Sequence, residues 1–257
     1  MRAPDELKVL VEEYLDELAL WPDLHGQAES VRYAFVEMGG KRIRPVICLA
    51  TGEAVGAEPE QILPAAAALE LVHNFSLVHD DLPALDNDEL RRGRPSTWAG
   101  FGEAVAILAG DALLAEALRL ALTYASPAVA RELVPATLGM IGGQYLDVTG
   151  AQTDLASLHR LKTGCLFSAS VACALWVAEV PERKQAPWRA FADEVGLLFQ
   201  IVDDILDEDG YLLEHGADGA RALADDTAER AQARLGEIPG DTAVLAEIVS
   251  GLAARTS

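Results

Sequence analysis

The side chains whose types and spacing point most directly to chemistry are two groups of aspartates far apart in the chain. The first runs from Asp80 to Asp86 and the second from Asp203 to Asp207. Each lies in an apolar stretch, where an unpaired carboxylate costs several kcal/mol of free energy, and neither contains a basic residue that could pair with it. Hard cations bridging the two groups would remove that cost, which points to Mg²⁺ and a phosphorylated ligand. Either group alone could instead be a set of solvated acids on an acidic protein.

The spacing within each group indicates how it could hold a cation. On a helix, Asp203 and Asp207 share one face and lie about 6 Å apart along the axis. Asp80 and Asp86 would fall on different faces of an ideal helix, but Pro83 between them should end or distort the helix. Asp86 could then fold back over the helix end and reach the same metal ion as Asp80.

Basic residues gather at two places that could bind a diphosphate. The segment Gly39–Pro45 carries three cations beside two glycines, whose small size lets backbone N–H groups approach a phosphate. The segment Arg91–Gly93 follows the first aspartate group and adds two arginines. Arginine binds diphosphate oxygens in a bidentate manner, and lysine adds a point charge. Either segment alone is more often a surface salt-bridge patch, so their occurrence together with the aspartates carries the prediction.

The composition excludes several classes of partner. The chain has 257 residues, is 51% hydrophobic and carries a net charge of −21, which argues against nucleic acid or an anionic membrane as a partner. Three cysteines, Cys48, Cys165 and Cys173, lie in apolar runs without metal-ligand spacing and are expected to be buried thiols. No uncharged stretch reaches the roughly 20 residues of a membrane span, and the first residues lack an apolar signal core. We therefore expect a cytoplasmic protein with no membrane span.

Helical periodicity covers most of the chain. Alanine is abundant, alternating β-branched residues are scarce and there is no Asn-Gly hairpin signal. The predicted helical segments are 7–18, 28–38, 42–54, 59–81, 102–124, 127–146, 154–180, 186–209, 215–235 and 242–254. The one long irregular stretch, 82–100, follows the first aspartate group. We predict a single all-α domain over residues 1–257, a helical bundle whose central helices carry the two aspartate groups facing each other.

Several long strings resemble motifs of the bacterial trans-isoprenyl diphosphate synthases, the farnesyl and geranylgeranyl diphosphate synthase group. These strings are Gly39–Pro45, His79–Asp88, Arg91–Gly93, Gly142–Asp147, Lys162–Gly164 and Phe199–Asp207. The resemblance runs in order from about residue 28 to residue 209. It implies the isoprenoid synthase fold with a central Asp-lined cavity, and head-to-tail condensation of isopentenyl diphosphate onto an allylic diphosphate.

The resemblance also implies a role for each matching position. The implied ligands of Mg²⁺, three ions when diphosphate is bound, are Asp80, Asp81, Asp86, Asp203, Asp204 and Asp207. Arg91 would join them at the allylic diphosphate, and the implied isopentenyl diphosphate site is Gly40, Lys41, Arg44, His73 and Arg92. The residues implied to line the reacting carbons are Lys162, Thr163 and Gln200. Gly164 is expected to loosen its helix so that the Lys162 carbonyl points inward. A lone histidine such as His73 is otherwise usually an ordinary core residue.

Product length is predicted from Phe75. It lies five residues before Asp80, deeper on the same helix, where the growing hydrocarbon tail should run. In the resembling family an aromatic residue at this place accompanies short products, so we predict C15 farnesyl diphosphate, with C20 next. The alternative is an ordinary core phenylalanine.

The chain departs from the family after the second aspartate group. The family normally has a loop there with two lysine-bearing motifs, which closes over the allylic diphosphate. Here residues 207–216 contain no lysine and lead almost directly into the next helix, and no lysine follows Lys184. Without that loop, the site should be less shielded from water. Trp98 also stands where the family often has a smaller polar residue or histidine.

Three classes of function remain open. The first is the elongating prenyltransferase, and the second is a class I terpene cyclase, which shares the first aspartate group but does not need an isopentenyl diphosphate site. The third is a non-catalytic or regulatory partner subunit that lost turnover together with the loop. The complete aspartate groups favour the first. The resemblance implies a homodimer formed through long helices, and the apolar stripe at 102–124 is compatible with that.

Overall fold

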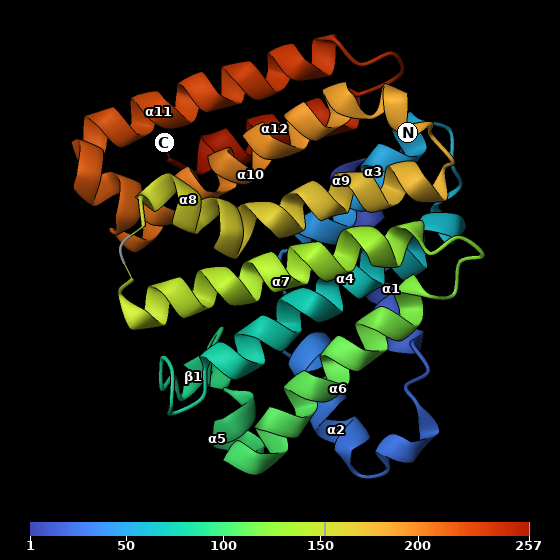
Figure 1. Ribbon diagram of the computed structural model, residues 1–257, viewed down its shortest axis with the longest axis vertical. Coiled ribbons are helices and arrows are strands. Elements are labelled where there is room, and N and C mark those ends of the chain that lie inside the picture. Colours follow the sequence, from blue (N-terminus) through green and yellow to red (C-terminus); the bar gives the residue numbers. More distant parts are fainter. Residues whose placement is uncertain (152, 257) are drawn as a thin grey trace.

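The computed structural model describes residues 1–151 and 153–256, and these residues are almost entirely helical (Figure 1). The α-helices are α1 (Pro4–Glu17), α2 (Gln27–Arg32), α3 (Ile43–Ala54), α4 (Pro59–Asp80), α5 (Thr97–Phe101), α6 (Glu103–Ala121), α7 (Ala128–Thr149), α8 (Leu155–His159), α9 (Cys165–Val177), α10 (Ala186–Asp207), α11 (Gly210–Gly236) and α12 (Ala243–Ala253). Short strands β1 (Leu90–Arg91) and β2 (Arg94–Pro95) pair antiparallel in the otherwise irregular stretch after α4. The predicted all-α class is confirmed.

Most helix boundaries lie close to their predicted positions, and the differences have local causes. The predicted helix 154–180 is interrupted by η3, a π-helical turn at Arg160–Gly164. A second π-helical turn, η2 (Tyr33–Glu37), ends the predicted helix 28–38. The last long helix begins before residue 215, at Gly210, and Gly216 breaks its first turns with a φ of 71°.

The centre of the bundle is α4, which is buried on nearly every side. It packs against α3, α6 and α9, and α10 packs against α9 and α11 (Figure 1). Among the described residues, α4 alone is long and apolar enough to cross a membrane, but 67% of its most apolar window is buried inside the bundle. A helix that is apolar all round and buried is typical of a protein core. Its carboxyl end, carrying the first aspartate group, therefore has a rigid support.

Candidate active site

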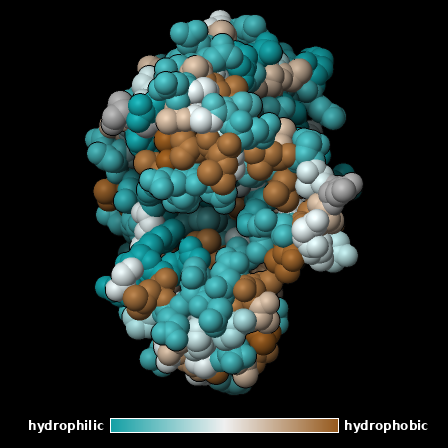
Figure 2. Space-filling model, turned by 90° about the vertical axis from the view of Figure 1, so that its left-hand side faces the viewer, coloured by the Kyte–Doolittle hydropathy of each residue, from teal (hydrophilic) through white to brown (hydrophobic). Residues whose placement is uncertain are grey.

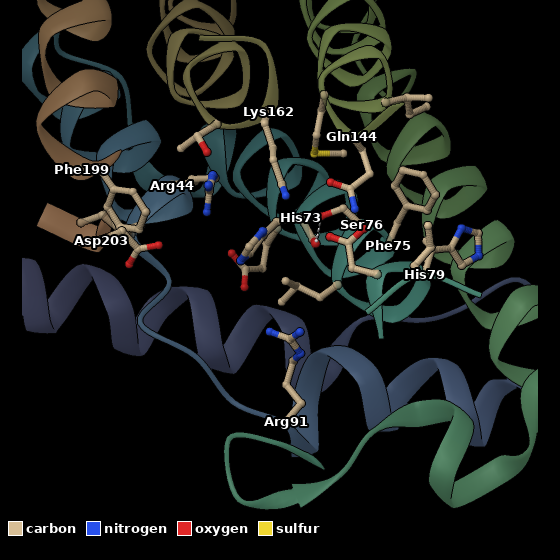
Figure 3. Close-up of a pocket in the computed structure, with 18 of the residues that line it drawn as sticks. Arg44, His73, Phe75, Ser76, His79, Arg91, Gln144, Lys162, Phe199 and Asp203 are labelled. Atoms are coloured by element: carbon tan, nitrogen blue, oxygen red, sulfur yellow. Dashed lines mark hydrogen bonds between the residues drawn. The ribbon is translucent and has the colours of Figure 1, made fainter. Parts of the chain in front are cut away.

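A cavity lies between the loop before α3, the carboxyl halves of α4 and α7, the η3 turn and α10. Its volume is about 640 Å³. The predicted site residues that line it are Lys41, Arg44, His73, Phe75, Asp80, Arg91, Arg92, Lys162, Thr163 and Asp203. Figure 3 shows Arg44, His73 and Lys162 directed into it, with Asp203 near one end and Phe75 near the other. On one face the molecule is hollowed between the segments around α8 and α11 and those around β1, with hydrophilic residues inside the hollow (Figure 2).

The first aspartate group marks the carboxyl end of α4. The amide of Asp86 donates a 2.9 Å hydrogen bond to the carbonyl of Asp80, so the backbone folds back over the helix end as predicted. Asp80 lines the cavity, whereas the Asp86 side chain is exposed. Burial, together with the nearby Asp86 carboxylate, raises the pKa of Asp80 to about 6. A cation that binds beside such a buried carboxyl group stabilises its charged form.

Asp81 has a different environment from Asp80. It is 1% exposed and is not part of the cavity lining. Its Oδ1 accepts hydrogen bonds from Nε and Nη2 of Arg91, at 2.8 Å and 2.5 Å. This ion pair joins two residues that were expected to act on the allylic diphosphate separately, and it holds Arg91 against the end of α4.

The second aspartate group also divides between the cavity and the protein interior. Asp203 lines the cavity, and its pKa is raised mainly by burial and next by Asp207, which is exposed at the end of α10. Asp204 is 6% exposed and does not line the cavity. Its Oδ1 accepts a 2.6 Å hydrogen bond from Nε2 of Gln200, and its Oδ2 accepts one of 2.8 Å from the backbone amide of Tyr211.

The carboxylates fit Mg²⁺ that is shared with a ligand. In the described ranges, 1–151 and 153–256, no three His, Cys, Asp or Glu side chains gather into a group that could hold a metal ion by themselves. Mg²⁺ is usually bound by one or two carboxylates together with water and substrate phosphates. Asp80 and Asp203 offer hard oxygen donors to one cavity from two helices, α4 and α10. These donors suit an ion whose remaining positions are filled by diphosphate and water.

Arg44 is buried without a polar partner. It is 7% exposed, its Nε has no hydrogen-bond partner, and no carboxylate pairs with it within the described residues. Its guanidinium lies over the ring of Phe167, 4.7 Å from the ring centroid, and 5.6 Å from that of Phe199. Burial lowers the pKa of Arg44 to about 10. A cation held by aromatic rings and left without an anion is poised to bind one.

The two basic segments meet at the mouth of this region. Nη1 of Arg92 donates to the carbonyl of Gly39, and a Cβ atom on Gly40 would lie 2.9 Å from Nη1 of Arg92. Gly40 therefore lets the arginine pack directly on the loop backbone. Lys41 is exposed and faces the cavity.

His73 lines the cavity among the arginines. Burial lowers its pKa well below the ordinary value, and Arg44, Arg92, Arg42 and Arg91 lower it further. Its imidazole is therefore neutral at pH 7 and can donate one hydrogen bond and accept another.

Lys162 and Thr163 are presented by the π-helical turn η3. Nζ of Lys162 pairs with Oδ2 of Asp147 on α7, a residue to which the sequence assigned no role. A Cβ atom on Gly143 would lie only 2.6 Å from the backbone nitrogen of Lys162, so this glycine allows α7 to approach the turn. The loosened helix was expected from Gly164. The π-helical turn ends at Gly164, where a Cβ atom would meet only ordinary contacts, the nearest being the His159 carbonyl oxygen at 3.8 Å. A Cβ atom on Gly196 of α10 would lie 3.3 Å from the Cα of Gly164.

Thr163, Gln200 and Asp204 form a chain of hydrogen bonds across η3 and α10. The Thr163 hydroxyl donates to Oε1 of Gln200 at 2.6 Å, and Nε2 of Gln200 donates to Asp204. Gln200 itself is not part of the cavity lining. Only Thr163 meets the cavity, so the other two act on it from behind.

Several cavity residues had no predicted role, and three of them are polar or charged side chains of α4 and α7. Glu70, Ser76 and Gln144 line the wall, and Oε1 of Gln144 is buried without a hydrogen-bond partner in the described part of the chain. Gln144 lay in a matching string, yet an uncharged side chain at that position gave no signal of its own. Phe75 packs edge-on against His79, with ring centroids 5.1 Å apart.

The turn between α10 and α11 is short. Only Glu208 and Asp209 separate the two helices, so the expected lysine-bearing loop has no counterpart between them. The turn is tight, because a Cβ atom on Gly210, which has a φ of 44°, would lie 2.0 Å from Oδ2 of Asp204. The same carboxylate oxygen binds the first turn of α11 at Tyr211.

Comparison with known proteins identifies the family. Residues 27–218 match the protein-family model described as Polyprenyl synthetase. The chain is 42% identical over 194 residues to a geranylgeranyl diphosphate synthase of Cyanophora paradoxa, an alignment that covers 70% of this chain and 64% of the relative. It is 40% identical over 190 residues to the farnesyl diphosphate synthase of Bacillus subtilis, covering 68% of this chain and 64% of that one. The alignments span between 53% and 64% of the length of the first three curated relatives.

The fold agrees with this match. The crystal structure of a geranyltransferase from Legionella pneumophila superposes with a TM-score of 0.87 at 33% identity, covering 98% of this chain and 96% of that one. The family match covers the cavity-lining residues of the α3 loop, α4, α7, η3 and α10 described above. The chain belongs to the polyprenyl synthetase family.

Proposed function

We propose that the protein is a Mg²⁺-dependent trans-prenyltransferase that condenses isopentenyl diphosphate head-to-tail with an allylic diphosphate. The similarity to proteins named farnesyl and geranylgeranyl diphosphate synthases supports this reaction class. The cavity supports this reaction class independently. Its basic side chains suit an anion that is bound directly, and its carboxylates suit an anion that is bound through metal ions.

The observation that carries the proposal is the unpaired guanidinium of Arg44. A buried charge is tolerated when it is paired, and among the described residues Glu70 and Asp203 act on Arg44 only through space, while its Nε has no hydrogen-bond partner. This arrangement supports an anionic ligand as the pairing group. Lys41 and the neutral His73 line the same cavity and add a point charge and an uncharged donor. A diphosphate group satisfies all three, since its oxygens accept from the arginine fork, the ammonium and the imidazole.

The carboxylates Asp80 and Asp203 suit the second, allylic diphosphate. Mg²⁺ bound there would supply Lewis-acid neutralisation of the diphosphate as it leaves. Lys162 stands near Asp80, where its charge lowers the pKa of that carboxyl against the effect of burial. It can therefore bind an oxygen of the leaving group while Asp147 holds it in position.

The reaction begins when the allylic C–O bond breaks and both bonding electrons leave with the diphosphate. The Thr163 hydroxyl donates its hydrogen bond to Oε1 of Gln200, so its oxygen lone pairs remain to face the cationic carbon. The double bond of isopentenyl diphosphate then forms the new C–C bond. A proton is lost from the adjacent carbon to the released diphosphate, which leaves a new allylic double bond.

We propose a short product, C15 ahead of C20. Phe75 lines the cavity at the end away from Asp203, and its ring is fixed by His79 (Figure 3). A tail growing from the aspartates along α4 would meet this ring. This geometry suits a limit on chain length.

A non-catalytic partner subunit is the second candidate, because one specific observation favours it. The two-residue turn between α10 and α11 leaves no segment there that could close over the allylic diphosphate. A reaction that passes through a carbocation requires water to be excluded from the active site. Against this candidate, Asp80, Asp203 and Arg44 all line one cavity, and a silent subunit has no chemical need for them.

We further propose that the protein forms a homodimer through α6 and α7. These helices, together with Leu122 just after α6, carry many of the large exposed apolar side chains: Ile107, Leu108, Leu122, Val134, Leu138, Ile141, Tyr145 and Val148. Large apolar side chains left exposed in such number are typical of a protein interface. Ile141, Tyr145 and Val148 also line the cavity, so a second copy covering this face would complete the cavity wall.

A product assay tests the proposal. Isopentenyl diphosphate is incubated with dimethylallyl, geranyl or farnesyl diphosphate, with Mg²⁺ or with EDTA, and dephosphorylated products are sized by mass spectrometry. A linear C15 or C20 alcohol that forms only with Mg²⁺ is expected. A cyclic hydrocarbon formed from the allylic substrate alone would establish a terpene cyclase, and no product with any substrate would favour the partner subunit.

A further inference from the structure

Arg42 stands between the two basic residues of the proposed isopentenyl diphosphate site, yet it is turned into the protein. Lys41, Arg42 and Arg44 all belong to the cavity lining, but the side chain of Arg42 is fully buried and its hydrogen bonds go to other parts of the protein. The turn requires a left-handed backbone, with a φ of 51° and a ψ of 31° at Arg42. A residue with a Cβ atom adopts this conformation at a cost of about 1 kcal/mol, so interactions of the side chain must hold it.

Four hydrogen bonds fix the Arg42 side chain, and their acceptors lie in three separate elements. Nε and Nη2 of Arg42 donate to the two carboxylate oxygens of Glu12 on α1, at 2.9 Å and 3.2 Å. Nη1 donates to Oε1 of Glu70 on α4 at 2.6 Å, and Nη2 donates to the carbonyl of Phe35 in the η2 turn at 2.5 Å. These bonds use four of the five N–H donors of a guanidinium, so Arg42 has little left to offer a ligand.

The same ion pair explains a buried acid in the wall of an anion-binding cavity. Glu70 lines the cavity and is almost completely buried, and on its own it would repel a diphosphate. Arg42 neutralises it at 2.6 Å, and Nδ2 of Asn74 donates to the same oxygen at 3.2 Å. Arg42, Glu70 and Glu12 together carry one positive and two negative charges. This group of side chains is therefore not an anion-binding site by itself.

We infer that Arg42 is a positioning residue of the isopentenyl diphosphate site, and that Glu12, which does not line the cavity, acts through it. By fixing the backbone at the start of α3, the buried guanidinium makes Lys41 and Arg44 face one cavity, with the guanidinium of Arg44 left unpaired. The inference rests on the proposed function, because it names which of the two diphosphates depends on this contact.

A substitution at Glu12 tests the inference without touching the cavity. Glu12 is 37% exposed on α1, and Glu12→Gln removes the charge that holds Nε and Nη2 of Arg42. We expect the KM for isopentenyl diphosphate to rise about fivefold to tenfold, as loss of one charge-assisted contact predicts. The KM for the allylic diphosphate and kcat should change less than twofold. A purely structural role of Glu12 would not separate these parameters.

The matched control is Glu13→Gln. Glu13 lies next to Glu12 on α1, is exposed and makes no side-chain hydrogen bond or ion pair within the described residues. It loses the same charge, so a general electrostatic effect would appear in both variants. We expect wild-type kinetics for this control. An equal rise of KM in both variants would overturn the inference.

A second variant and a binding measurement keep the inference separate from the proposed function. Arg42→Lys offers one nitrogen to acceptors on three elements, so it should weaken binding further, and adding Glu12→Gln to it should have little extra effect. Titration calorimetry with inorganic diphosphate reports the direct site even if no condensation occurs. Wild-type protein that binds diphosphate but makes no product would refute the proposed function alone. Unchanged diphosphate affinity and unchanged KM in both variants would refute the role of Arg42.

Discussion

Nε2 of Gln200 donates a 2.6 Å hydrogen bond to Oδ1 of Asp204, and this contact determines which way Thr163 presents its hydroxyl. A carboxylate can only accept hydrogen bonds, so the amide nitrogen of Gln200 must face it. The amide oxygen must then face Thr163, whose hydroxyl donates to it at 2.6 Å. The lone pairs of the Thr163 oxygen are left toward the cavity, where they can stabilise a cation.

The first prediction concerns this dipole. Thr163→Val keeps the shape of the side chain and removes the oxygen, so we expect kcat to fall by about 10- to 100-fold, the effect of ~1.4–2.8 kcal/mol on the barrier. Substrate KM values should change little, because the interaction strengthens only as charge develops. Thr163→Ser is the control and should retain most of the activity. Equal kcat values for the valine and serine variants would contradict this role.

The second prediction separates the two adjacent aspartates. Asp203 lines the cavity, whereas Asp204 is committed to Gln200 and to Tyr211 at the start of α11. Asp203→Asn should lower turnover by about 100-fold or more and raise the Mg²⁺ concentration needed for half-maximal activity, since charge stabilisation by a metal ion is worth several kcal/mol.

Asp204→Asn should differ in kind. An amide cannot accept from both donors, so the Gln200 amide or the start of α11 must rearrange. We expect a lower midpoint of thermal unfolding and a lower kcat, with the Mg²⁺ requirement unchanged. A Mg²⁺ titration of both variants checks this. An equal rise of the Mg²⁺ requirement in the two variants would mean that Asp204 is a metal ligand as important as Asp203.

Much of the fold and part of the site followed from the sequence. Helical periodicity located the helices, and Pro83 located the end of α4, because both are properties of the local chain. The pairing of Asp81 with Arg91 was not predicted, since a string of aspartates does not reveal which carboxylate points inward. The same holds for Arg42, whose direction depends on a positive φ and on partners in α1 and α4.

The π-helical turn at Arg160–Gly164 shows the same limit. Gly164 suggested a loosened helix, and the turn ends at this residue, but the close approach of α7 to the turn occurs at Gly143, which gave no such signal. Which glycine matters is decided by packing between α7 and the turn. A single sequence without a structure does not contain that information, whereas a long motif such as Phe199–Asp207 does place its residues near one site.

The third prediction tests Phe75 as the limit on chain length. Phe75→Ala opens the end of the cavity and should shift products toward longer chains, C20 and beyond, and Phe75→Leu should give an intermediate distribution. The alanine variant will also be destabilised by about 3 kcal/mol, the usual cost of removing a buried ring. Product sizes should therefore be compared at a temperature where both variants are folded. An unchanged product distribution would make Phe75 an ordinary core residue.

The fourth prediction concerns pH and His73. Burial and the surrounding arginines depress the pKa of His73 in the folded protein, so the unfolded chain binds its proton more readily. The contribution of His73 to stability is complete above the ordinary histidine pKa of about 6.5 and is lost as the pH falls below it, by up to ~1.4 kcal/mol per pH unit. His73→Gln cannot take up this proton. Urea unfolding from pH 7.5 to pH 5 should therefore show a steeper loss of stability in the wild type than in the variant, and parallel curves would mean that His73 is protonated in the folded state.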